Sequence, residues 1–227
     1  MRFLSRLPKQ CHVCGFTIDR SLGHNLWCEH CQPLFNFECH RCARCGLTMD
    51  NTAEICGVCL STPPPWQTLT CLGDYRPPLS SFIQRIKRHK EPWLLPPLSK
   101  LLAERIKNEP APLLICVPTQ LHVELQRGFN LSELIMLQLA QHLPEVKTAD
   151  SIFRKHRQTA TQKSLNRQQR MENVRQAFSL QQSPTSKHVA IIDDVVTTGA
   201  TVRHLSELLL EVNVEKIDIY CLCRTPK

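Results

Sequence analysis

The chain has 227 residues, of which 42% are hydrophobic, and it carries a formal net charge of +8. This length allows one domain of ordinary size and a small second one, and the apolar fraction is sufficient for a buried core. No apolar run is long enough to span a membrane, and the apolar stretch in "MRFLSRLPKQ" is too short for a signal peptide. We therefore expect a cytoplasmic protein.

Positive charge is concentrated in two parts of the chain. Residues 63–112 hold twice as many basic as acidic residues, and residues 151–187 hold eight basic residues against the single acid Glu172. Blocks of this kind attract polyanions, such as diphosphate or a nucleic acid backbone.

The N-terminal segment, residues 1–62, is rich in cysteine. Nine of the 13 cysteines lie there, and eight of them form four C-x-x-C pairs separated by 10 to 13 residues. In a cytoplasmic chain this spacing indicates metal rather than disulfides, because each pair can direct two thiolates to one tetrahedral ion. We therefore expect a double zinc ribbon with two structural Zn²⁺ sites. The candidate ligands are Cys11, Cys14, Cys28, Cys31, Cys42, Cys45, Cys56 and Cys59.

The spacing leaves open which pairs share an ion. Sequential pairing, with the first four of these cysteines in one site and the last four in the other, closes the shorter loops. An interleaved arrangement is the alternative. The segment has little apolar content, so its folding should depend on metal, which contributes about 10–16 kcal/mol in small zinc fingers. The cysteines expected in the core instead are Cys71, Cys116, Cys221 and Cys223.

The proline run in "STPPPWQ" ends this head, because three consecutive prolines continue neither a helix nor a central strand. We expect a linker over residues 63–70 and a second domain over residues 71–227. In that domain apolar runs and helical periodicities alternate, which predicts a parallel α/β sheet flanked by helices. The expected strands are 69–75 (an edge strand), 112–118, 189–192 and 216–224. The expected helices are 78–90, a second that starts near Pro97 and runs to 107, 129–143 and 201–212.

The basic residues of the helix 78–90 and of the segment 153–178 are candidates for phosphate contacts with nucleic acid. A solvated basic segment without a partner is the alternative. Aromatic residues are sparse there, so base stacking is poorly supported. The candidate contacts are Lys87, Arg88, Arg154, Lys155, Arg157, Lys163, Arg167 and Arg170.

The stretch "VAIIDDVVTTGATV", residues 189–202, combines a buried strand, two acids and a Thr/Gly loop before an amphipathic helix. The loop N–H groups and the positive end of the helix dipole suit a phosphate. Asp193 and Asp194 would repel that phosphate, and they suit sugar hydroxyls or a divalent cation that accompanies a polyphosphate. The alternative is that the two acids only cap a turn.

This stretch resembles the signature of type I phosphoribosyltransferases. The resemblance assigns Asp193 and Asp194 to the ribose hydroxyls of phosphoribosyl diphosphate, and it implies Mg²⁺ bound with that ligand. The same resemblance assigns the 5-phosphate to Thr197, Thr198, Gly199, Ala200 and Thr201. Cationic side chains would stabilise departing diphosphate, and the candidates are Arg127, Arg154, Arg157 and Lys163. No residue stands out as a general base.

Several segments together resemble the ComF/GntX family: the cysteine-pair head, "IQRIKRHK", "CVPTQLHVELQRGFNLSEL", "TATQKSLNRQQRMENVRQAF" and "IIDDVVTTGAT". The resemblance covers nearly the whole chain. It implies a phosphoribosyltransferase-like fold and a cytoplasmic role in the uptake and use of external DNA, in which single-stranded DNA is handled. A DNA-uptake helicase or another competence protein is then a candidate partner.

Two main hypotheses follow. The chain is a DNA-handling protein whose sugar-phosphate site holds or senses a phosphoribosyl ligand, or it is an active phosphoribosyltransferase in nucleotide salvage. A zinc-dependent adaptor with a vestigial site is the third reading, and the complete Asp-Asp and Thr/Gly motif weighs against it.

Overall fold

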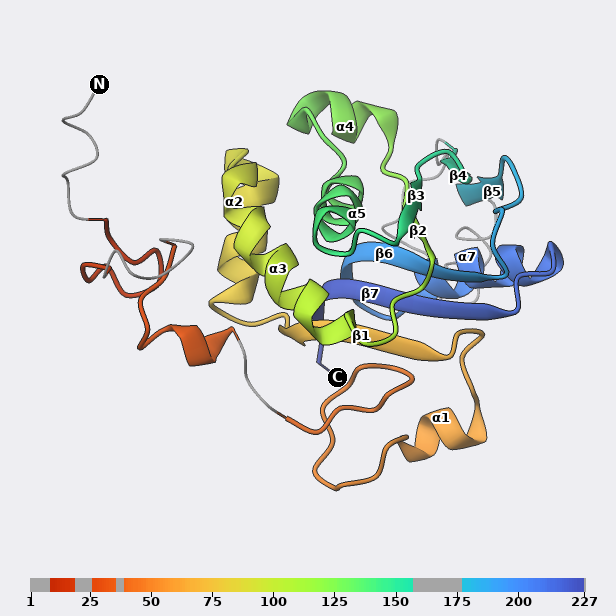
Figure 1. Ribbon diagram of the computed structural model, residues 1–227, viewed down its shortest axis with the longest axis horizontal. Helices are drawn as coiled ribbons and strands as arrows, with labels where there is room; N and C mark the ends of the chain where they lie inside the picture. The colour runs from red at the N-terminus through yellow and green to blue at the C-terminus, as the bar shows by residue number, and fades with distance from the viewer. Residues whose placement is uncertain (1–8, 19–25, 36–38, 157–176, 227) are drawn as a thin grey trace, which may run out of the picture.

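The computed structural model describes residues 9–18, 26–35, 39–156 and 177–226. Its centre is a parallel sheet of five strands in the order β1-β7-β6-β2-β3 (Figure 1). The strands are β1 (Thr68–Asp74), β7 (Lys216–Arg224), β6 (His188–Val196), β2 (Leu113–Cys116) and β3 (Lys147–Ala149). The predicted α/β class is confirmed, and β1 lies at one edge of the sheet as expected.

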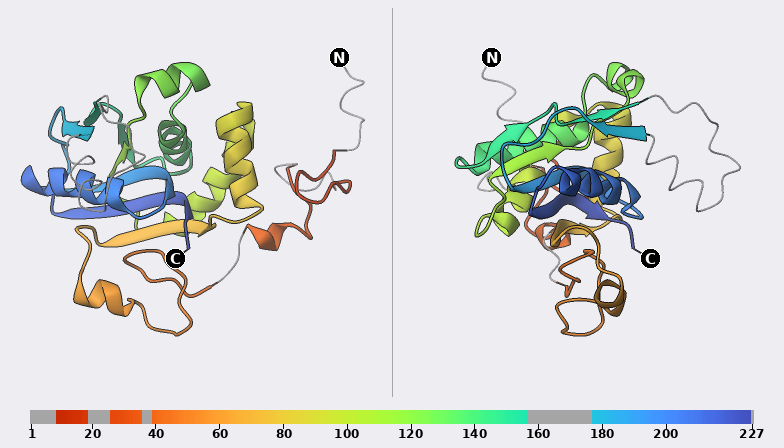
Figure 2. Two further views of the ribbon diagram at one scale, coloured as in Figure 1. Left: turned by 180° about the vertical axis from the view of Figure 1, so that it is seen from behind. Right: turned by 90° about the vertical axis from the view of Figure 1, so that its right-hand side faces the viewer.

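Helices cover both faces of the sheet (Figures 1 and 2). One face packs against α2 (Leu79–His89), α3 (Leu95–Ile106) and α5 (Leu131–His142). The other packs against α7 (Ala200–Glu211) and a two-stranded antiparallel ribbon of β4 (Phe153–Lys155) and β5 (Phe178–Leu180). Short elements complete the described fold: η2 (Gln32–Leu34), α1 (Gly57–Ser61), η3 (Pro92–Leu94) and α4 (Leu121–Arg127).

Strand β6 shows why the sheet is buried on both sides. Its side chains alternate between the two faces, so Ala190 and Ile192 join the core under α3 and α5 while Val189 and Ile191 join the core under α7. A strand covered on both faces has no polar side, and this accounts for the continuous apolar run in the sequence.

The expected end of this strand at Ile192 is wrong. β6 continues through both aspartates to Val196, because its partner β7 is equally long and pairs with it as far as Arg224. The short elements α4, β3, β4 and β5 were also missed, since three to seven residues of weak pattern give little periodicity. No helix among the described residues combines the length and the apolar character needed to span a membrane.

The cysteine-rich head lies against the sheet domain in two places (Figures 1 and 2). Its first part packs on α2, where Trp27 stacks on Phe35 with 3.9 Å between ring centroids and both rings contact Phe82. Its second part runs along the edge strand, where the Leu69 N–H donates to the Ala43 carbonyl at 2.8 Å. Strand β1 begins at Thr68, inside the segment 63–70 that the proline run marks as a linker.

Candidate functional site

A cavity of about 260 Å³ lies at the carboxyl ends of β2 and β6. The helices that follow these neighbouring strands cover opposite faces of the sheet, α5 after β2 and α7 after β6. A crevice at such a reversal point is where open α/β sheets bind ligands. The lining residues are Val117, Pro118, Thr119, Gln120, Val123, Arg127, Ser132, Lys155, Asp193, Asp194 and Thr201.

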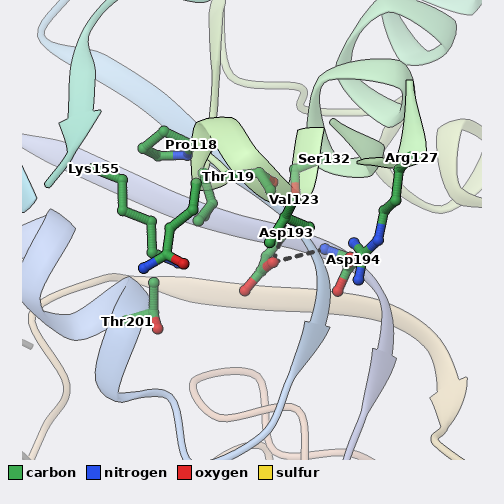
Figure 3. Close-up of a pocket in the computed structure, with 11 residues that line it drawn as sticks. Pro118, Thr119, Val123, Arg127, Ser132, Lys155, Asp193, Asp194 and Thr201 are labelled. Carbon is green, nitrogen blue, oxygen red and sulfur yellow. Dashed lines mark hydrogen bonds between the residues drawn. The ribbon is translucent and has the colours of Figure 1, made fainter. Parts of the chain in front are cut away.

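The two aspartates provide the negative charge of the cavity (Figure 3). The Asp193 carboxylate accepts hydrogen bonds from the Asp194 N–H at 2.8 Å and from the Ser132 hydroxyl at 3.5 Å. Burial, followed by the charge of Asp194, raises the pKa of Asp193 to about 7. Asp194 forms an ion pair with Lys87 of α2, with 2.7 Å between Nζ and Oδ2.

Two cationic side chains reach the cavity from different elements. Arg127 ends α4 and Lys155 ends β4, and Figure 3 shows them on either side of the carboxylates. Burial lowers the pKa of Lys155, while the charges of Asp193 and Asp194 act in the opposite direction. The Lys155 ammonium also lies 5.1 Å from the ring centroid of Phe178, which fixes the side chain over the ribbon.

The Thr/Gly loop connects β6 to α7. Gly199 caps the helix with φ of 81°, a left-handed conformation that glycine adopts without strain. Thr197 and Thr198 are exposed, and the Thr198 hydroxyl accepts from the Ala200 N–H at 3.3 Å. Thr201 lies in the first turn of the helix and lines the cavity. The amino end of α7, the positive end of the helix dipole, is therefore next to the two carboxylates.

Asn130 fixes the opposite wall of the cavity. Its side-chain amide donates to the Val117 carbonyl at 3.1 Å, and its Oδ1 accepts from the Thr119 hydroxyl at 2.9 Å and from the Ser132 N–H at 3.1 Å. The residue thus caps α5 and also holds the loop that follows β2.

The structure gathers part of the predicted set in one place. Both aspartates, Thr201, Arg127 and Lys155 surround the cavity. Arg154 is exposed on β4 and Arg88 is exposed on α2, and neither lines it. The other four predicted arm residues lie outside the described part of the chain: Arg157, Lys163, Arg167 and Arg170.

Sequence reasoning did not assign Lys87, Ser132 and Asn130 to this cavity. Lys87 was expected to contact nucleic acid, but its ammonium pairs with Asp194 and its side chain is 25% exposed. Asn130 and Ser132 lie in the segment "CVPTQLHVELQRGFNLSEL", which was the available signal. Their contacts depend on how α5 packs against β6, and the local sequence carries no information on that packing.

The eight paired cysteines form two groups of four in sequential order, and in each group the ligand atoms lie within 4.8 Å of one another. The interleaved alternative is thereby excluded. The first group is Cys11, Cys14, Cys28 and Cys31, and the second is Cys42, Cys45, Cys56 and Cys59. All other cysteines expected in the core are buried there: Cys71, Cys116, Cys221 and Cys223.

The geometry of both groups fits zinc. Sulfurs bound to Zn²⁺ at about 2.3 Å in a tetrahedron lie about 3.8 Å apart, and the Cys14–Cys28 and Cys45–Cys56 sulfurs are 3.7 and 3.8 Å apart. Backbone N–H groups also point at sulfur, as with Cys28 N to Cys11 Sγ at 3.4 Å and Cys56 N to Cys42 Sγ at 3.3 Å. These contacts favour the thiolate form that binds metal.

The sheet, the cavity and the cysteine clusters together define a phosphoribosyltransferase-type α/β protein with two four-cysteine clusters of zinc-ribbon type. The family model of the phosphoribosyl transferase domain matches residues 126–227. The chain belongs to the ComF/GntX family. It is 35% identical over 226 residues to the DNA utilization protein YhgH of Shigella flexneri, covering 96% of this chain and 98% of that protein. It is also 32% identical to Competence protein F of Haemophilus influenzae, covering 89% and 92% of the two chains.

Among solved structures, a purine phosphoribosyltransferase from Pyrococcus horikoshii aligns with 58% of this chain and 73% of its own, at 15% identity and a TM-score of 0.36. The alignment is partial, so the fold class rests on the strand order and the family model.

Proposed function

We propose that this protein acts in the use of external DNA, and that its cavity binds phosphoribosyl diphosphate with Mg²⁺. The observation that carries the ligand assignment is the meeting of Asp193 and Asp194 with the amino end of α7 in one cavity. A phosphorylated pentose needs carboxylates for its hydroxyls and N–H groups for its phosphate, and the cavity places both side by side.

The proposed contacts follow from charge and position. The 5-phosphate lies in the loop of residues 197–201, and the ribose hydroxyls donate to the two carboxylates. The diphosphate lies toward Arg127 and Lys155, which supply positive charge from either side. Mg²⁺ would accompany the diphosphate and neutralise part of its charge.

The relatives support the role in DNA use. They are named for DNA utilization and competence, and their similarity to this chain extends over nearly their full length. Single-stranded DNA would contact the exposed basic residues Arg88 and Arg154 and the basic segment that follows β4. The zinc ribbons are then structural modules that offer a surface to DNA or to a partner such as a DNA-uptake helicase.

Titration calorimetry with phosphoribosyl diphosphate and Mg²⁺ tests the ligand assignment. We expect binding by the wild type and a loss of at least about tenfold in affinity for the double variant Asp193→Asn/Asp194→Asn, because neutral amides keep the shape and remove the charge. Lys187→Ala is the control, since Lys187 pairs with Glu215 away from the cavity. Equal affinity of wild type and double variant would refute the assignment.

The placement of Arg127 and Lys155 also favours a second candidate, phosphoribosyl transfer. Cations on either side of the carboxylates suit stabilisation of diphosphate as it leaves C1 of the ribose. Release of diphosphate in the presence of a panel of free bases would establish this activity, whereas ligand binding without release would leave the holding or sensing role.

A further inference from the structure

Arg224, the last residue of β7, connects the second cysteine cluster to the Thr/Gly loop. The residue is 6% exposed. Its Nε donates to the carbonyl of the cluster residue Cys45 at 2.8 Å, and its Nη1 donates to the Val196 carbonyl at 2.9 Å and to the carbonyl of Thr197, the first residue of the loop. One buried guanidinium thus joins two segments that lie about 150 residues apart in the sequence.

Trp66 forms a second connection between the same two segments. Its indole N–H donates to the Arg44 carbonyl at 2.6 Å, between the first two cysteines of the cluster, and the Arg44 guanidinium donates back to the Trp66 carbonyl at 3.3 Å. The far edge of the Trp66 ring lies 3.5 Å from the position that a Cβ of Gly199 would occupy. The guanidinium of Arg203, in the second turn of α7, lies 5.7 Å from the ring centroid.

We propose that the second cysteine cluster is a support of the Thr/Gly loop, with Arg224 and Trp66 as positioning residues that hold the loop in its binding conformation. The buried guanidinium of Arg224 keeps its position only while the Cys45 carbonyl accepts from it. The hydrogen bond from Arg224 to Thr197 therefore depends on the turn of residues 42–46. Metal bound at Cys42 and Cys45 would hold this turn in place.

The first cysteine cluster is the natural comparison, because it has the same ligands and a different neighbour. Its aromatic contacts go to Phe82 on α2 and, from His12, to Trp93 of η3. None of the hydrogen bonds described for that cluster reaches the loop of residues 197–201. The proposed support is therefore specific to the second cluster.

Hydrogen–deuterium exchange of the full chain tests the support without any ligand. In Arg224→Lys the planar fork is lost and the positive charge is kept, so we expect amides in peptides covering residues 197–203 to exchange about tenfold faster, with α5 unchanged. The matched control is Arg85→Lys. Arg85 lies beside the first cluster, where its guanidinium pairs with Glu91 at 2.7 Å and lies 3.5 Å from the His12 ring nitrogen. An equal increase in the exchange rate of the loop in both variants, or no increase in either, would overturn the proposal.

A second pair of variants tests the metal. Cys59→Ser and Cys31→Ser each remove the last cysteine of one cluster, and we expect the loop to exchange faster only in Cys59→Ser. Faster loop exchange in Cys31→Ser as well would overturn the specificity. Should Arg224→Lys fail to fold, Trp66→Phe replaces it, with Trp27→Phe as its control at the first cluster.

This inference rests on the proposed function only for its consequence in binding. There we expect Arg224→Lys to weaken the binding of phosphoribosyl diphosphate about tenfold and Arg85→Lys to leave the affinity within about twofold. If the wild type binds no such ligand, the proposed function fails and the exchange measurements still decide whether the cluster supports the loop.

Discussion

The ammonium of Lys87 and the carboxylate of Asp194 form an ion pair of 2.7 Å that links α2 to the end of β6. The two side chains are 25% and 16% exposed, so the pair is only partly shielded from solvent. The carboxylate proposed to receive a ribose hydroxyl is thus neutralised by a residue of the basic helix.

Replacing Lys87 with Met should lower the free energy of unfolding by about 1–2 kcal/mol, because Asp194 is left unpaired in a partly buried place. Urea denaturation measures this change. A double-mutant cycle with Asp194→Asn isolates the pair, and we expect the double variant to lose less than the sum of the single losses. Strict additivity would show that the pair contributes nothing.

The raised pKa of Asp193 predicts a pH dependence of ligand binding. A ribose hydroxyl donates to an ionised carboxylate, and the ionised fraction rises through the pKa of about 7. Affinity for phosphoribosyl diphosphate should therefore increase about tenfold between about pH 6 and pH 8. Asp193→Asn should show only the dependence that the ligand's own phosphates contribute, and an unchanged profile in that variant would contradict the assignment.

The same pKa shift affects stability with a definite sign. Between the ordinary value of 3.8 and about 7 the folded chain holds a proton that the unfolded chain has lost. The stability of the wild type should therefore fall as pH rises through this window, and Asp193→Asn should lack that fall. Unfolding free energies at pH 5 and pH 8 measure it.

The two cysteine clusters predict two zinc ions per chain. Elemental analysis should find one ion fewer in Cys31→Ser and in Cys59→Ser, and each variant should lose several kcal/mol of local stability. Cys39→Ser is the control, because Cys39 belongs to neither group and should leave the zinc content unchanged. Loss of both ions from a single variant would show that the clusters are not independent.

Binding of single-stranded DNA should weaken as salt rises. Each phosphate contact contributes about 0.7 to the slope of log affinity against log salt, so Arg88→Ala and Arg154→Ala should each flatten the slope by about that amount. Both residues are exposed. Lys187→Ala, at an exposed ion pair with Glu215, should leave the slope unaltered. Fluorescence anisotropy with a labelled oligonucleotide gives these slopes, and an affinity independent of salt would refute phosphate contacts.

Asn130→Ala should lower the free energy of unfolding by about 2 kcal/mol, because it removes the cap of α5 and the donor to the Val117 carbonyl. Asn130→Asp keeps the acceptor for the Ser132 N–H and should recover about half of the loss. Thermal unfolding distinguishes the two variants, and an equal loss in both would assign the whole effect to the amide donor.

Sequence alone determined the parts of this protein that depend on local pattern. The spacing of the cysteine pairs indicated two four-cysteine groups, and the apolar run of β6 with the Thr/Gly loop indicated a ribose-phosphate motif. The alternation of apolar runs and helical periods gave the parallel sheet. Periodicity and ligand spacing are properties of neighbouring residues, so no tertiary information was needed.

The tertiary structure decided which distant residues meet. Lys87 is in a basic helix that suggested a nucleic acid surface, and only the packing of α2 against the sheet brings it to Asp194. Arg224 is the polar end of a buried strand, and only the position of the second cluster gives it Cys45 and Thr197 as partners. Such contacts depend on strand order and on the placement of the head, and both are set by the burial of apolar surface over the whole chain rather than by any local pattern.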